Sequence, residues 1–222
     1  MELDTILSRF QQQALAYFKK TSLVKHFYLA GGTALAEYYL HHRKSEDLDF
    51  FTQEELSIKI LRDFSTQLQT LMPMDKVEYQ HGFGLYSFFF SPKGEVAQYK
   101  IDFGQYPFGP IEPLRLIDKL HIESLYDIAV DKAHTISVRP RLRDFIDLYS
   151  ILDREKTWKF EALIQKSQEK FEIVVDPFQL GENLLQVNQL IDMPIMLKPV
   201  NLKAVRTFFL FQAKQLQKRI FT

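Results

Sequence analysis

Residues 27–52 read FYLAGGTALAEYYLHHRKSEDLDFFT, and this stretch decides which fold we expect. It passes from an apolar run, typical of a strand, through Gly31 and Gly32 into an Ala- and Leu-rich run, typical of a helix. Two glycines permit a tight turn and a close approach of the backbone to a ligand, and the first N–H groups of a helix lack partners within it. The turn is therefore a candidate phosphate site with Thr33 beside it, unless Thr33 serves only as the N-cap of the helix.

A pair of acids begins 14 residues after Thr33, in the run SEDLDFF. If this run is a strand, Asp47 and Asp49 point to one face and stand about 7 Å apart at their Cα atoms. Magnesium takes oxygen ligands and is usually held by one or two carboxylates together with substrate phosphates. The pair therefore predicts a site for Mg²⁺.

A third acid, Asp102, lies in the run VAQYKIDFG. In a strand, Lys100 and Asp102 share one face, while the apolar residues between and after them fill the other. An acid on a strand beside the pair completes a set of three metal-binding carboxylates. Asp102 would act as a general base or as a second ligand of the metal, helping a substrate hydroxyl to attack the α-phosphate of a nucleotide.

The periodicity of apolar residues divides the chain near residue 122 into two lobes. In the first lobe helical and extended patterns alternate, which predicts an α+β lobe. Its expected helices are at about 2–20, 32–40 and 54–71, and its expected strands are at about 26–30, 47–51, 76–80, 84–91 and 95–103, with a hairpin turn at Ser91–Gly94. In the second lobe five helices separated by prolines are expected, at about 123–137, 142–153, 157–170, 178–190 and 200–218.

Composition excludes several classes of protein. The formal net charge of the 222 residues is zero, so attraction to nucleic acid needs a local patch rather than a global field. The chain has no cysteine, which excludes disulfides, zinc-thiolate sites and thiol catalysis. It has neither the apolar core of a signal peptide nor a run of about 18 apolar residues, so we expect a soluble cytoplasmic protein without a membrane segment.

The order of these motifs resembles one superfamily of enzymes. Gly31-Gly32-Thr33, then Asp47-Leu48-Asp49, then a strand acid about fifty residues later is similar to the polymerase β superfamily of nucleotidyltransferases. Within it, the stretch AGGTALAEYYLHHRKSEDLDFF resembles the AbiEii/AbiGii toxin family, whose members carry a Gly-Gly-Thr-Ala-Leu helix, a His-Arg-x-Ser stretch and an Asp-Leu-Asp-Phe-Phe strand. The resemblance is close over about residues 27–52 and loose elsewhere. It implies a polymerase β-type core, a mixed sheet flanked by helices, over residues 1–122, and a helical C-terminal lobe over residues 123–222.

A second match to the family lies in the helical lobe, in the runs DIAVDKA at 127–133 and RDFIDL at 143–148. The resemblance implies that these residues serve substrate binding and turnover. On a helical wheel Lys132 falls inside the apolar arc, between the isoleucines one turn before it and one turn after it, so its charge should be paired or aimed into a cleft. Two interpretations stay open: a structural ion pair between helices, or a triphosphate-binding Lys132 oriented by Asp144 or Asp147.

Basic and histidine residues near these motifs invite other interpretations. Adjacent His41 and His42 would point about 100° apart on a helix and lack a His-x-x-x-His spacing, so we do not expect zinc. Arg43 could contact phosphate, but we favour a helix C-cap or a pair with a local acid. The basic tail from Lys203 to Arg219 could follow an RNA backbone, but we favour a solvated outer face.

Together the motifs predict a Mg²⁺-dependent nucleotidyltransferase that moves a nucleoside monophosphate from an NTP to an acceptor hydroxyl. The resemblance implies a toxin with an RNA acceptor, such as a tRNA end, and a cognate antitoxin protein. Transfer to a hydroxyl of a small molecule or a protein is a second possibility for the enzyme. From another class, the chain could be a binding module that keeps the fold and the nucleotide pocket without turnover.

Overall fold

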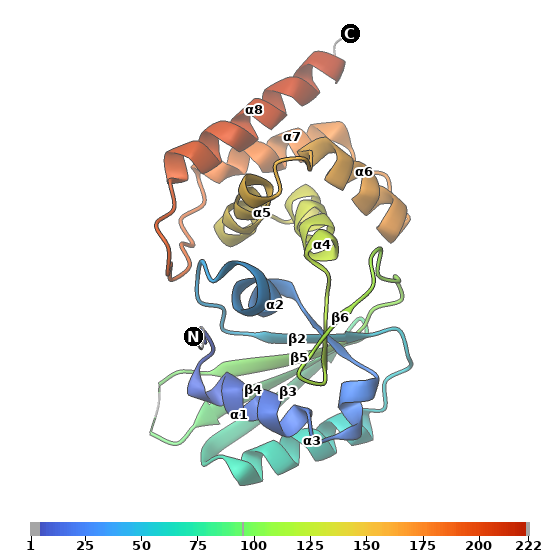
Figure 1. The fold of residues 1–222 in the computed structure, drawn as a ribbon, viewed down its shortest axis with the longest axis vertical. Coiled ribbons are helices and arrows are strands. Elements are labelled where there is room, and N and C mark those ends of the chain that lie inside the picture. Colours follow the sequence, from blue (N-terminus) through green and yellow to red (C-terminus); the bar gives the residue numbers. More distant parts are fainter. Residues whose placement is uncertain (1–4, 95, 221–222) are drawn as a thin grey trace. The chain divides into compact units, whose positions relative to one another are not determined.

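In the computed structural model, which describes residues 5–94 and 96–220, the chain divides into two units (Figure 1). Unit 1 comprises Met1–Glu37 and Ser45–Ser124, and unit 2 comprises Tyr38–Lys44 and Leu125–Thr222. The short segment Tyr38–Lys44 therefore belongs with the C-terminal helices, a feature that the periodicity of the sequence does not reveal.

Unit 1 is built on a mixed sheet. Within the described residues it has seven strands in the order β3-β4-β5-β2-β1-β7-β6. Their bounds are β1 Tyr28–Ala30, β2 Leu48–Thr52, β3 Met74–Gly82, β4 Leu85–Pro92, β5 Tyr99–Gln105, β6 Arg115–Ile117 and β7 Leu120–Ile122. The pairs β2–β5 and β1–β7 are parallel, and the other neighbouring strands are antiparallel. The expected α+β class with a mixed sheet is confirmed.

One face of this sheet carries an aromatic core. Alternation along the strands sends Phe50 and Phe103 to the same side, where both are fully buried. Two helices cover that side, α1 (Arg9–Phe18) and α3 (Ile58–Leu71), as Figure 1 shows. The ring of Phe18 from α1 stacks on Phe50 with centroids 4.1 Å apart, and Phe64 from α3 meets Phe103 edge-on at 5.6 Å. This packing leaves the charged residues of β2 and β5 to the opposite face.

The helix that follows the diglycine is short and changes its hydrogen-bonding pattern. It starts as α2 (Gly31–Leu35) and continues as a π-helix, η2 (Ala36–Leu40). The expected helix at 32–40 is thus confirmed in extent. The N-cap of α2 is Ala30, so the alternative that Thr33 caps this helix is wrong.

Several boundaries in unit 1 differ from the expectations. The first helix begins at Arg9 because Ser8 and Gln11 form a capping box there, while residues 2–4 of the expected helix lie outside the described residues. The five expected strands are present, although residue 95 lies outside the described residues. The hairpin β6–β7 was not expected, since strands of three residues carry almost no alternation signal. A 3-10 turn, η1 (Ser22–Lys25), precedes β1.

Unit 2 consists of helices, and the five expected helices are confirmed. They are α4 Leu125–Val138, α5 Leu142–Arg154, α6 Phe160–Phe171, α7 Pro177–Leu185 with the 3-10 turn η3 Gln186–Asn188, and α8 Leu202–Ile220. Helix α4 packs against α5, α6 and α7, and α8 packs against α7 and α5. In the described part of the chain, every helix is too short or too polar to span a lipid bilayer.

Candidate active site

The centre of the candidate site is a pair of aspartates on neighbouring strands. Asp49 of β2 is the register partner of Asp102 of β5, and the two strands run parallel. Register partners point to the same face, and adjacent strands lie about 4.8 Å apart, so two carboxylates are held side by side. Asp102 is almost completely buried. A buried carboxylate beside another needs a cation to offset desolvation and repulsion.

Lys100 supplies a positive charge among these acids. It precedes Asp102 by two residues on β5, so it shares the same face, as expected. Its Nζ donates to Asp102 Oδ2 at 2.8 Å and lies 3.4 Å from Asp47 Oδ2. Burial lowers the pKa of Lys100, but the hydrogen bond and charge of Asp102 and the charges of Asp47 and Asp49 outweigh it and raise that pKa. The three acids singled out in the sequence therefore surround one ammonium group.

The diglycine turn lies directly against this cluster. Gly31 has a φ of +68°, and a Cβ atom built on it would lie only 2.6 Å from Asp49 Oδ2. Its N–H donates to the buried carboxylate of Glu123 at 3.4 Å. Only glycine fits this position, because any side chain would collide with the Asp49 carboxylate and would need a left-handed backbone.

The side chain of Thr33 supports the site from within the protein and does not face a ligand. It is fully buried, and its hydroxyl donates a hydrogen bond to the backbone carbonyl of Asp47. The bond joins the first turn of α2 to the residue that precedes β2. Thr33 therefore fixes the backbone that carries the first acid of the Asp-x-Asp pair.

The donor set of this cluster suits a hard cation. Carboxylate oxygens are the ligands that Mg²⁺ prefers. Asp102 Oδ1 is buried and, among the described atoms, has no hydrogen-bond partner, so this oxygen has capacity for one more ligand. In the described residues no three His, Cys, Asp or Glu side chains are already arranged around a metal position, and the ammonium of Lys100 is the cation that lies between Asp47 and Asp102.

A second charged cluster lies in unit 2, around Asp147 of α5. The guanidinium of Arg43 donates two hydrogen bonds to this carboxylate, from Nε to Oδ1 at 2.6 Å and from Nη2 to Oδ2 at 2.7 Å. His42 Nε2 lies 2.8 Å from Oδ1, and Lys132 Nζ lies 2.9 Å from Oδ2. Burial raises the pKa of Asp147, but the charge of Lys132 and the hydrogen bonds of Arg43 and His42 outweigh it and hold that pKa well below its ordinary value.

Lys132 joins both acids of α5. Its Nζ lies 2.6 Å from Asp144 Oδ1, in addition to its contact with Asp147. Burial lowers the pKa of Lys132 and the charge of Arg43 does so too, but the charges of Asp147 and Asp144 dominate and raise it. The helical-wheel prediction that Lys132 is paired is confirmed, and the interhelical ion pair of the structural interpretation is present.

Three residues of these clusters were missed or misassigned by sequence reasoning. The acid that pairs with Arg43 is not local but lies 104 residues further along the chain. His42 was considered only as a zinc ligand and dismissed, although it is a partner of Asp147. Glu123, which accepts from Gly31, was not singled out. Arg43 and His42 stand out in the structure only because they are buried. No sequence pattern shows directly that a charged side chain is buried.

Comparisons with known proteins agree with this architecture. Residues 13–212 match the family described as "Nucleotidyl transferase AbiEii toxin, Type IV TA system". The chain is 31% identical over 167 residues to an uncharacterized protein of Aquifex aeolicus (strain VF5), a match covering 74% of this chain and 76% of that protein.

Two solved structures show the same fold at low sequence identity. JHP933 from Helicobacter pylori superimposes with a TM-score of 0.57 at 15% identity, over 95% of this chain and 90% of that one. A candidate nucleotidyltransferase from H. pylori superimposes with a TM-score of 0.59 at 17% identity, over 96% of this chain and 97% of that one. With the family match spanning nearly the whole sequence, the chain belongs to the AbiEii family of nucleotidyl transferase toxins.

Proposed function

We propose that this protein transfers a nucleoside monophosphate from an NTP to an acceptor hydroxyl with the help of Mg²⁺. The observation that carries the proposal is the register pairing of Asp49 with Asp102, with Asp47 reaching the same ammonium group. Asp47, Asp49 and Asp102 would hold the metal. When bound there, Mg²⁺ would neutralise the phosphate charges and stabilise the charge that develops during transfer.

Asp102 is the residue best placed to receive a proton from the acceptor. Its Oδ2 accepts from Lys100, while its buried Oδ1 lacks a partner among the described atoms. An acceptor hydroxyl that donates to Oδ1 would be both oriented and activated for attack on the α-phosphate. Lys100 would hold the Asp102 carboxylate in place through its hydrogen bond to Oδ2.

The triphosphate would approach along the diglycine turn. Gly31 and Gly32 carry no side chains, so the backbone of the turn can lie close to the Asp49 carboxylate, and Thr33 holds Asp47 in place. Lys132 would steady the triphosphate or the leaving pyrophosphate, with Asp144 and Asp147 orienting its ammonium.

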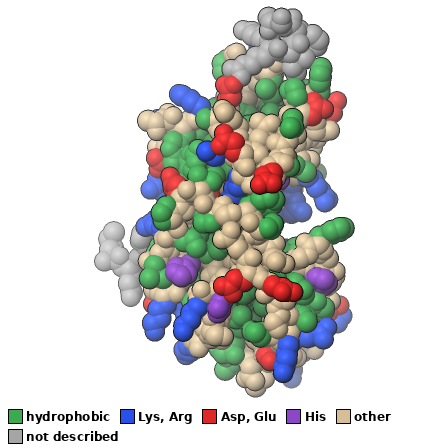
Figure 2. Space-filling view, turned by 90° about the vertical axis from the view of Figure 1, so that its right-hand side faces the viewer, with side chains coloured by type: hydrophobic (Ala, Val, Ile, Leu, Met, Phe, Trp, Pro, Cys, Tyr) green, Lys and Arg blue, Asp and Glu red, His purple; other side chains and the backbone are tan. Residues whose placement is uncertain are grey.

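The acceptor in this proposal is RNA, such as a tRNA end, and the partner is a cognate antitoxin. The family to which the chain belongs is one of toxins in type IV toxin–antitoxin systems. On the face drawn in Figure 2, Lys and Arg side chains are interspersed with Asp and Glu side chains, which agrees with the net charge of zero. RNA recognition would therefore rely on local contacts close to the site rather than on a large basic surface.

A second candidate is a binding module without turnover. It is favoured by the position of Lys100, whose ammonium already lies against Asp102 and Asp47 where a metal would bind. In that case nucleotides would bind to the protein, but no label would move to an acceptor.

The test is incubation with each of the four NTPs labelled at the α-phosphate, with Mg²⁺, and with either total RNA or the protein alone. Asp49→Asn should abolish labelling, while the exposed Asp63→Asn on α3 should leave it unchanged. Oxidation of the 3′-terminal diol of the RNA should also abolish labelling if that end is the acceptor. Nucleotide binding without transfer would favour the module, and a folded protein that neither binds nor transfers would overturn both functions.

A further inference from the structure

Lys100 places a positive charge among the acids that would bind the metal. Its Nζ donates to Asp102 Oδ2 at 2.8 Å and lies 3.4 Å from Asp47 Oδ2. Mg²⁺ is held about 2.1 Å from its oxygen ligands, so an ion on either of these two oxygens would lie within about 5.5 Å of the ammonium. Two cations this close repel each other, and most strongly where water is excluded. Lys100 therefore weakens the binding of a metal ion that arrives alone.

The same ammonium can bind a phosphate. A lysine side chain carries three N–H donors. In the described part of the chain Asp102 accepts one of them and Asp47 lies at a longer distance, so at least one donor is left for another acceptor. The Lys100 side chain is 28% exposed, so a ligand can reach it from solvent. A phosphate oxygen suits this position, because a hydrogen bond between an ammonium and a phosphate is strengthened by both charges.

A triphosphate reverses the effect of Lys100 on the metal. The negative charges of the triphosphate offset the repulsion between the metal ion and the ammonium, and its oxygens can contact both cations at once. Each ligand then makes the binding of the other more favourable, which is a coupling between two ligands. Lys100 can keep its hydrogen bond to Asp102 meanwhile, so the coupling requires no rearrangement of β5.

We propose that Lys100 makes metal binding depend on the triphosphate: it weakens the binding of the ion alone and donates to a phosphate oxygen when ion and NTP bind together. The inference rests on the proposed function, because it concerns the metal and the triphosphate of that site. It adds an order of events, in which the metal enters with the nucleotide and not before it.

Binding of Mn²⁺ alone tests the first half of the proposal without any catalysis. Mn²⁺ takes the same oxygen ligands as Mg²⁺, and its free concentration is measured by electron paramagnetic resonance. Lys100→Met should bind Mn²⁺ at least about tenfold more tightly than the wild type, whereas the exposed Lys76→Met should not. Lys100→Arg retains the charge and should bind Mn²⁺ as weakly as the wild type. Equal affinity of the wild type and Lys100→Met for Mn²⁺ would overturn the proposal.

Two further variants secure this measurement. Lys100→Gln, which is also neutral, takes the place of Lys100→Met if circular dichroism shows that the latter does not fold. Adding Asp49→Asn to the neutral variant should weaken Mn²⁺ binding again, because the ion would lose one of its carboxylates. Tight binding that persists in the double variant would place the ion elsewhere and contradict the assignment.

Binding of the metal together with a nucleotide tests the second half. Complexes of Mn²⁺ with the four α,β-methylene NTP analogues, which cannot lose pyrophosphate, are titrated by calorimetry. In the wild type the best of these complexes should bind at least about tenfold more tightly than Mn²⁺ alone, and Lys100→Met should reduce this ratio at least about tenfold. An unchanged ratio in the variant would contradict a coupling through Lys100.

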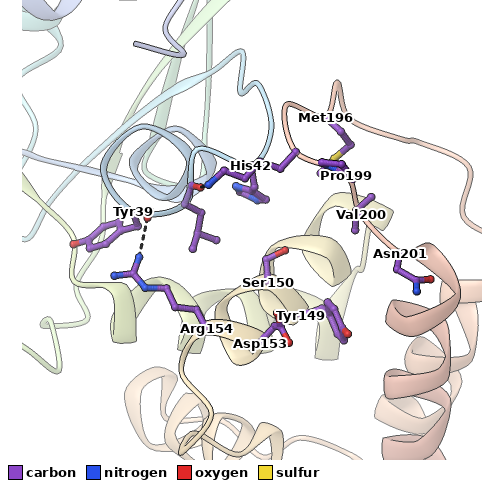
Figure 3. A pocket seen from close by; sticks show the side chains of 12 residues that line it. Tyr39, His42, Tyr149, Ser150, Asp153, Arg154, Met196, Pro199, Val200 and Asn201 are labelled. Atoms are coloured by element: carbon purple, nitrogen blue, oxygen red, sulfur yellow. Dashed lines mark hydrogen bonds between the residues drawn. The ribbon is translucent and has the colours of Figure 1, made fainter. Parts of the chain in front are cut away.

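A cavity of about 540 Å³ in unit 2 is the alternative place for the nucleotide (Figure 3). Its lining mixes donors and acceptors, among them Tyr149, Asp153 and Arg154, and so selects neither a cationic nor an anionic ligand. Val200→Trp fills this cavity and should leave the binding of the Mn²⁺–nucleotide complex unchanged. Loss of that binding in folded Val200→Trp would place the nucleotide in the cavity and overturn the proposal.

The outcomes separate the role of Lys100 from the proposed function. The expected binding without transfer of label to any acceptor would support the coupling and reject the enzyme. Transfer of label together with equal Mn²⁺ affinity of the wild type and the neutral variant would reject the coupling and support the enzyme. A folded protein that binds neither the ion nor the complexes would overturn both.

Discussion

Asp49 of β2 and Asp102 of β5 are register partners on adjacent parallel strands, on the face of the sheet opposite to its phenylalanine core. Backbone hydrogen bonds of the sheet fix their separation, so neither can move away from the other without breaking the register. The repulsion between the two carboxylates is therefore built into the fold, and a cation has to offset it. Lys100 does so in this structure.

Replacing Lys100 should expose this repulsion. In Lys100→Met, Asp47, Asp49 and Asp102 lose the ammonium group, and we expect the free energy of unfolding to fall by about 1–3 kcal/mol without metal. Mg²⁺ should then raise the melting temperature more in the variant than in the wild type, because it binds the folded state. Thermal unfolding with and without Mg²⁺ measures both effects. The exposed Lys76→Met is the control, and equal responses of variant and wild type would contradict the account.

Adding one methyl group to the diglycine turn should disturb the acids. Gly31→Ala places a Cβ 2.6 Å from Asp49 Oδ2 at a residue with a φ of +68°, so we expect a loss of about 1–2 kcal/mol and a displaced Asp49 carboxylate. Nucleotidyl transfer should fall with it. Gly181→Ala on α7 is the matched control, because nothing lies within 4 Å of its Cβ and alanine favours a helix. Retention of full activity in Gly31→Ala would show that the turn tolerates a side chain.

The charged cluster of unit 2 should be a large determinant of stability. Asp147→Asn would leave Lys132 and Arg43 buried without their shared carboxylate, and we expect a cost of about 3–5 kcal/mol. The single tryptophan, Trp158, packs on Tyr126 within unit 2, so its fluorescence reports on that unit during denaturation. Glu169→Gln, which removes an exposed ion pair with Lys166, should change stability by less than about 1 kcal/mol. Similar effects of the two substitutions would contradict a buried network.

The same cluster contributes to the pH dependence of unit 2. The folded pKa of Asp147 lies below its unfolded value of about 3.9, so its stabilisation is complete above about pH 5 and is lost as the pH falls through the folded pKa. The folded pKa of Lys132 lies above its unfolded value of about 10.4, so its stabilisation is present below that pH and is lost as the pH rises through the folded pKa.

Trp158 fluorescence in denaturant, followed from pH 3 to pH 7, measures the acid side of this dependence. Asp147→Asn should flatten the fall in stability at low pH, because the group that titrates there is gone. If the free energy of unfolding falls equally with decreasing pH in the wild type and the variant, the dependence belongs to other carboxylates.

The sequence predicted the parts of the fold and site that depend on local order. Alternation along β5 predicted that Lys100 and Asp102 share a face, because side chains two residues apart on a strand do so, and Asp49 of β2 pairs in register with Asp102. Asp47 precedes β2, so its contact with Lys100 does not follow from strand alternation. The five helices of unit 2 followed from apolar periodicity and proline spacing in the same way.

The features of the fold and site that the sequence could not predict depend on contacts between residues far apart in the chain. The pairing of Arg43 with Asp147 joins positions 104 residues apart, and the assignment of Tyr38–Lys44 to unit 2 follows from such contacts. The burial of Thr33 was hidden for a similar reason, since its partner is a backbone carbonyl that any residue would offer. Strands β6 and β7 are too short for their pattern to stand out.

The most direct test of the central claim follows the phosphate itself. The protein is incubated with Mg²⁺, RNA and the NTP that it accepts, labelled in parallel at the α- or the γ-phosphate. Label from the α-phosphate should enter the RNA and label from the γ-phosphate should leave as pyrophosphate. Asp102→Asn should slow the transfer at least about 100-fold, because even residues that only orient a metal ligand contribute about 10–100-fold. Transfer of the γ-label, or undiminished transfer by Asp102→Asn, would contradict a site built on the paired aspartates.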